Sequence, residues 1–95
     1  MDLSNPVHDE IEVIIRELPL AIERLNSDYN KFFTGTEKIP PIDARTRLDR
    51  RVERARTLLR QCTSPPLSFR LQTVLSTFLT YKTMWDKKLR DREAT

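Results

Sequence analysis

Apolar side chains recur every three or four residues over three long stretches of this chain, which is the spacing of one helix face. The stretches cover residues 6–33, 41–62 and 65–92. Each apolar set falls on one side of a helical wheel, so each stretch is predicted to form an amphipathic helix. The predicted core positions are Val7, Ile11, Ile14, Ile15, Leu18, Ala21, Ile22, Leu25, Tyr29, Phe32 and Phe33 in the first helix, Ala44, Leu48, Val52, Ala55, Leu59 and Cys62 in the second, and Leu67, Leu71, Val74, Leu75, Phe78, Tyr81, Trp85 and Leu89 in the third.

Prolines and small polar residues mark the predicted starts of these helices. Asn5 is predicted to cap the first helix, with Pro6 at its first position. Ser64 and Pro65 repeat this arrangement at the third helix, and Pro41 is predicted at the first position of the second. Proline is favoured at such a position because its missing N–H would have no partner there in any case.

Two residues are expected to shape the first helix and its end. Pro19 removes one backbone hydrogen bond, but the apolar stripe keeps its phase across it, which predicts a kink and not a break. Gly35 follows the last aromatic residue and is predicted to stop the helix. The joining segments, of about seven and two to three residues, favour antiparallel neighbours. The predicted fold is therefore all-α, an antiparallel three-helix bundle forming a single domain over residues 1–95.

Composition argues against most catalytic designs, because the chain has one glycine, one histidine and one cysteine. Glycine-rich phosphate loops need several residues with positive φ, which one glycine does not supply. His8 and Cys62 offer too few ligands for a metal site and have no orienting partner for nucleophilic catalysis. We therefore predict a solvated histidine, a buried cysteine, no enzymatic activity, no metal and no cofactor.

The sequence also bears on location. The longest run without a charged residue, residues 71–81, is shorter than a membrane-spanning helix and contains several polar residues. The first residues show neither the basic nor the apolar region of a secretory leader. These features predict a cytoplasmic protein with no membrane partner.

One side of the predicted third helix is uncharged for about four turns, in a chain that is 33% charged. Small hydroxyl side chains there would let another helix approach closely, with larger apolar residues as anchors. The predicted interface residues are Phe69, Thr73, Ser76, Thr77, Thr80 and Met84. Our first hypothesis is a non-enzymatic interaction module that forms a homodimer or binds a helical partner protein through this face. Val13 and Leu20 are further apolar residues predicted to lie outside the core.

The second predicted helix is rich in arginine, and the chain has a net charge of +3. Four arginines follow the helical spacing of one face, and paired guanidinium donors suit phosphate groups. These residues are Arg47, Arg50, Arg51 and Arg54. They carry the alternative hypothesis, a protein that binds the RNA or DNA backbone.

Ion pairing within the bundle would explain the same arginines without a ligand. The first helix is acidic, and flanking charges commonly set the register between neighbouring helices. The expected contacts between helices join Asp28 to Arg47 and Arg51, and Glu17 to Arg54 or Arg56. The expected pairs within the second helix are Asp43 with Arg47 and Asp49 with Arg45.

Three short segments carry a resemblance to known proteins. They are Phe32-Phe33-x-Gly35, Phe69-Arg70-Leu71-Gln72-Thr73 and Thr80-Tyr81-x-x-Met84-Trp85-Asp86. Over most of its length the chain resembles small helical proteins of bacterial origin that have no assigned function. The resemblance implies a helical fold and brings no functional residues with it.

Overall fold

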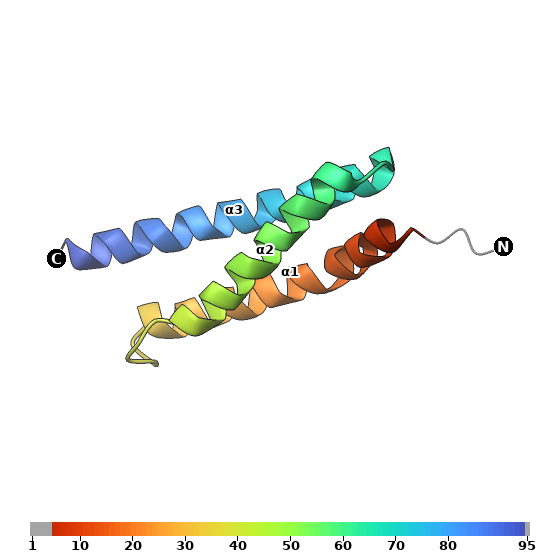
Figure 1. Ribbon diagram of the computed structural model, residues 1–95. Coiled ribbons are helices and arrows are strands. Elements are labelled where there is room, and N and C mark those ends of the chain that lie inside the picture. The colour runs from red at the N-terminus through yellow and green to blue at the C-terminus, as the bar shows by residue number, and fades with distance from the viewer. Residues whose placement is uncertain (1–4, 95) are drawn as a thin grey trace.

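The computed structural model describes residues 5–94, which form the predicted bundle of three helices (Figure 1). These are α1 (Pro6–Phe33), α2 (Ile42–Gln61) and α3 (Pro65–Glu93). No strand occurs between residues 5 and 94, so the all-α fold class is confirmed. The predicted helix ends differ from the observed ends by one residue at most. Residues 1–4, on which the prediction about a secretory leader rests, lie outside the described residues.

The bundle is long and slim, with extents of 60 × 18 × 16 Å. α1 packs against both other helices, whereas α2 packs less closely against α3. Figure 1 shows why, since α2 crosses obliquely from the start of α3 to the end of α1. The second half of α3 therefore packs mainly on α1, which leaves much of its surface open to solvent.

Local hydrogen bonds account for the helix ends. The Asn5 side chain accepts hydrogen bonds from the backbone N–H groups of Val7 (3.0 Å) and His8 (3.3 Å). Ser64 Oγ accepts from the N–H of Leu67 at 3.5 Å, so both predicted caps are confirmed. The prediction for α2 is wrong by one residue, because Pro41 is the cap and the helix begins at Ile42.

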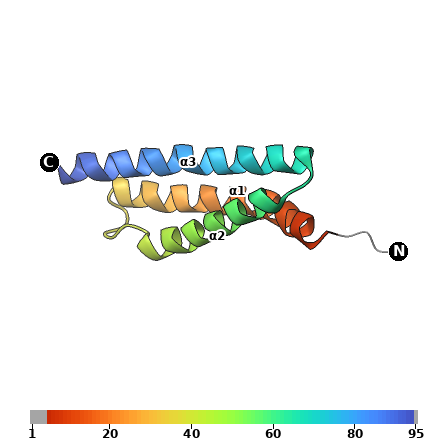
Figure 2. The ribbon, with the colours of Figure 1, turned by 45° about the horizontal axis from the view of Figure 1, so that its top comes forward.

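α1 continues through Pro19 without a break, as predicted. Figure 2 shows its first turns, in red, inclined to the rest of the helix. After the last turn, the Thr34 hydroxyl donates to the Asn30 carbonyl at 2.8 Å. Gly35 then takes a φ of +86°, a conformation that favours glycine and reverses the chain, which agrees with its predicted role.

The core consists of two adjoining apolar clusters. The larger one joins all three helices around Tyr29, Phe78 and Trp85. The smaller one lies toward the α2–α3 turn and contains Ile11 and Leu58. Leu58 is only 1% exposed although the predicted seam of the second helix omitted it. Leu58 lies three residues after Ala55 and packs in the same cluster as Ala55, Ile11 and Leu71, so it belongs to the same apolar face.

Within the described residues, no helix is both long enough and apolar enough to cross a bilayer.

Candidate functional site

The uncharged side of α3 is exposed along most of its predicted length. Phe69 is 70% exposed, and Thr73, Ser76, Thr77 and Thr80 are exposed beside it. A shallow hollow of about 360 Å³ runs along these five residues and Gln72. Met84 differs from the prediction, because it is half-buried and packs against the larger core cluster. The face that another molecule can reach is therefore centred on the residues from Phe69 to Thr80.

The threonine hydroxyls on this face already have acceptors within their own helix. Thr73 Oγ1 donates to the Phe69 carbonyl at 3.1 Å, and Thr77 Oγ1 donates to the Thr73 carbonyl at 3.0 Å. Thr80 Oγ1 donates to the Ser76 carbonyl at 3.1 Å. Covering the face would therefore strand none of these three donors, which removes a large part of the cost of burying hydroxyl groups.

Two of the four arginines on the predicted polyanion-binding face are paired with carboxylates of α1. Arg54 makes a bidentate pair with Glu10, with both N–O distances at 2.8 Å. Arg51 lies 3.9 Å from Glu17, so the predicted pairing of Glu17 with Arg54 or Arg56 is wrong by one helical turn. Hydrogen bonding to Arg54 lowers the pKa of Glu10. Arg47 and Arg50 are exposed and form no ion pair with any residue from 5 to 94.

The ion pairs predicted within α2 are also absent from the described residues. Arg45 turns away from Asp49 and instead pairs with Asp86 of α3 at 2.6 Å. Its guanidinium also donates to the Tyr29 hydroxyl at 3.1 Å. Arg45 therefore has one polar partner on α1, Tyr29, and one on α3, Asp86.

These contacts belong to a polar network that surrounds the aromatic part of the core. Trp85 Nε1 donates to Asn26 Oδ1 at 2.9 Å, and the Tyr29 and Trp85 rings stack with centroids 4.9 Å apart. The hydrogen bond from Arg45 holds the pKa of Asp86 below its ordinary value. Burial by itself would lower the pKa of Arg45, but the hydrogen bonds to Asp86 and Tyr29 outweigh burial, so the pKa of Arg45 is raised. The rings are packed inside the bundle, so they are not available for stacking on nucleic-acid bases.

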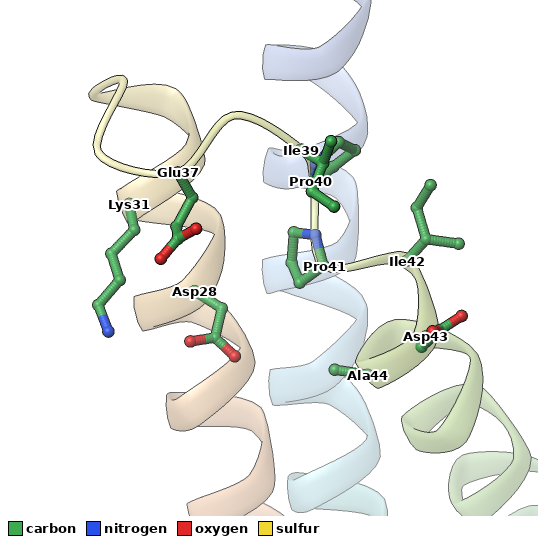
Figure 3. Close-up of a pocket in the computed structure, with 9 residues that line it drawn as sticks. All are labelled: Asp28, Lys31, Glu37, Ile39, Pro40, Pro41, Ile42, Asp43 and Ala44. Atoms are coloured by element: carbon green, nitrogen blue, oxygen red, sulfur yellow. The ribbon is translucent and has the colours of Figure 1, made fainter.

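A further hollow, of about 550 Å³, lies where the chain turns from α1 into α2. Figure 3 shows the Asp28 and Glu37 carboxylates on one side of it, facing Pro41 and Ala44 on the other. This hollow was not predicted from the sequence, where the corresponding signal is the pair of prolines flanked by isoleucines at positions 39 and 42. The lining has three carboxylates, Asp28, Glu37 and Asp43, and one cation, Lys31, so its net charge is negative and disfavours anions.

His8 was predicted to be solvated, but it is half-buried and joins the start of α1 to the α2–α3 turn. Its Nε2 accepts a hydrogen bond from the backbone N–H of Thr63 at 3.2 Å. Cys62 was predicted to be buried, but it is half-buried, packing against the smaller core cluster, and its thiol donates to the Ser64 carbonyl at 3.4 Å. Nothing within the described residues groups three or more candidate metal ligands.

We expect His8→Ala to lower the free energy of unfolding by about 0.5–1 kcal/mol, because the contacts of His8 Nε2 with the backbone N–H and the hydroxyl of Thr63 are lost. The Thr63 amide can turn to water, which keeps the effect small. Urea unfolding measures the change, and amide hydrogen exchange should accelerate at Thr63. Glu12→Ala, at an exposed position of α1, is the control. Equal losses in both variants would contradict a role for the imidazole.

Comparisons with known proteins give no assignment, since no protein-family model, curated protein or solved structure matches the chain. The resemblance to small bacterial helical proteins therefore stays a prediction.

Proposed function

We propose that this protein is a non-enzymatic interaction module that pairs with a second copy of itself through the uncharged face of α3. The observation that carries the proposal is the 70% exposed Phe69 at the end of a row of exposed hydroxyl residues whose threonine donors are satisfied internally. Covering a helix surface of this kind costs little free energy, because the threonine hydroxyls keep their acceptors. The small side chains also let a second helix approach closely.

The order of side-chain sizes along the face favours an antiparallel pair of α3 helices. With a two-fold axis between Ser76 and Thr77, Thr73 of one copy lies opposite Thr80 of the other. The same axis sets the large Phe69 opposite Met84, so small residues meet at the centre and large ones at both ends. The half-buried Met84 contributes the edge of its side chain to this contact.

Charge supports the same register. Arg70 of one copy falls opposite Thr83 of the other, and Lys87 falls opposite Pro66. No like charges face each other across the axis, whereas a parallel pair would place Lys87 beside Lys87. The uncharged face of α3 from Phe69 to Met84 is about 22 Å long, so we expect a small interface and a micromolar dissociation constant.

The test is the mass of the protein in solution as a function of concentration. We expect light scattering to report a shift from monomer to dimer between about 1 μM and about 1 mM. Thr77→Asp with Thr80→Asp should abolish the dimer, because two charges per copy would be buried at the centre of the contact. Thr36→Asp with Thr46→Asp adds the same charge at exposed positions outside α3 and should leave the dimer intact.

Two results would overturn the proposal. One is a monomer throughout the concentration range, which would leave the face to a different helical partner or to solvent alone. The other is a dimer that survives the α3 double variant, which would place the contact elsewhere. Circular dichroism of each variant verifies that the helices are retained.

A further inference from the structure

A second feature lies on a different side of the molecule, along the groove between α1 and α2. Glu10, Glu17 and Arg24 are spaced seven residues apart, so they follow one edge of α1 that faces α2. The first two meet arginines of α2, as Glu10 pairs with Arg54 and Glu17 lies near Arg51. At the third position α1 carries Arg24 in place of a carboxylate, so the pairing of opposite charges across the groove ends there.

The replacement brings arginines of both helices to one hollow. Arg24 of α1 lines it together with Arg47 and Arg51 of α2, and its volume is about 240 Å³. Asp28 is the single carboxylate in this lining. Neither Arg24 nor Arg47 forms an ion pair with another residue of the described chain. Arg51 is held only at 3.9 Å from Glu17, so it too has donors to spare.

The rest of the lining is apolar. Leu25 and Leu48, each 3% exposed, form part of it, with the half-buried Ala21 and Ala44 beside them. Guanidinium groups next to such a surface interact more strongly with an opposite charge than they would in open water. Like charges across a helix pair are unfavourable by themselves, and an anion between them would remove this repulsion.

We infer that this hollow binds a phosphate group. Phosphate presents several oxygens that match the planar, paired donors of arginine. With three guanidinium groups and the single Asp28 carboxylate, the lining has a net charge of +2. The phosphate belongs either to a nucleic-acid backbone or to a small phosphorylated molecule. The site includes Arg24 and excludes Arg50, and thus differs from the arginine face predicted on the second helix. It is also independent of the α3 face.

The experiment uses two probes, inorganic pyrophosphate and a fluorescent single-stranded RNA of about 20 nucleotides, at about 50 mM salt. Arg24→Gln with Arg47→Gln should weaken binding by about tenfold or more. Arg16→Gln with Arg50→Gln is the matched control, because it also removes from α1 and α2 one exposed arginine each that forms no ion pair with residues 5–94. We expect this control to change binding by less than about twofold.

A gain of binding provides an independent check. Asp28→Asn removes the only negative charge of the lining and should tighten binding by about threefold. Displacement of the bound RNA by pyrophosphate would indicate that the ligand is a small phosphorylated molecule. RNA that stays bound in the presence of pyrophosphate would indicate that the ligand is a nucleic-acid backbone. The inference is overturned if neither probe binds, or if the Arg16 and Arg50 control weakens binding as much as the Arg24 and Arg47 variant, because attraction would then depend on net charge alone.

Discussion

Replacing Trp85 with alanine should lower the free energy of unfolding by about 4 kcal/mol, the largest effect that we expect from any single substitution. Trp85 is 0% exposed and contacts Tyr29, Phe78 and Tyr81 through its ring. A bundle this narrow has no second layer of side chains that could move inward, so the cavity would persist. In a domain of this size the loss corresponds to a fall in Tm of about 16–32 °C.

Urea unfolding followed by circular dichroism is the appropriate measurement, because the substitution removes the only tryptophan of the chain. Leu79→Ala, which truncates a 53% exposed residue of the same helix, is the control and should cost less than about 1 kcal/mol. Trp85→Phe should fall between the two, since it keeps a ring but leaves Asn26 Oδ1 without its donor. Similar losses for Trp85→Ala and Leu79→Ala would contradict the central position of the indole.

The fold was largely predictable because its determinants are local. Asn5 and Ser64 bond to amides within three residues, and Gly35 reverses the chain by its own φ. Apolar spacing then identified nearly every core residue. Leu58 is the buried residue that the predicted seam omitted, although it lies three residues after Ala55 on the same face of α2.

The surfaces were less predictable than the core. Exposure of Phe69 follows from helical periodicity, because it stands opposite the apolar stripe of its own helix. Ion pairs depend instead on which turns of two helices meet, and a shift of one turn moved the partner of Glu17 from Arg54 to Arg51. Arg24 was not predicted as a site residue, because it is distinguished only by its closeness to Arg47, which lies on another helix.

The second large effect concerns Arg45, the only residue that joins all three helices by polar contacts among those described. We expect Arg45→Met to lower the free energy of unfolding by about 2 kcal/mol at pH 7. The substitution keeps helix propensity and most of the side-chain stem. It leaves the Tyr29 hydroxyl without its donor and Asp86 without its closest cation. Arg50→Met, at an exposed and unpaired position of the same helix, should change stability by less than about 0.5 kcal/mol.

Acid should reduce the difference between the wild-type protein and Arg45→Met. The pKa of Asp86 is lowered in the folded protein, chiefly by its hydrogen bond to Arg45. The carboxylate therefore contributes stability above the ordinary pKa of aspartate, and this contribution is lost as the pH falls through the lowered pKa. Urea midpoints measured at pH 7 and at successively lower pH should show the gap between the two proteins narrowing, because protonation of Asp86 removes the negative charge that Arg45 stabilises.

A double-mutant cycle separates this ion pair from the other contacts of Arg45. Asp86→Asn alone should also destabilise the protein, and adding it to Arg45→Met should cost less than the sum of the two single changes by about 1 kcal/mol. The remaining loss in Arg45→Met then belongs to the hydrogen bond with Tyr29 and to packing. Strictly additive changes, with a gap that does not depend on pH, would mean that the Arg45–Asp86 pair contributes nothing to holding α2 against α3.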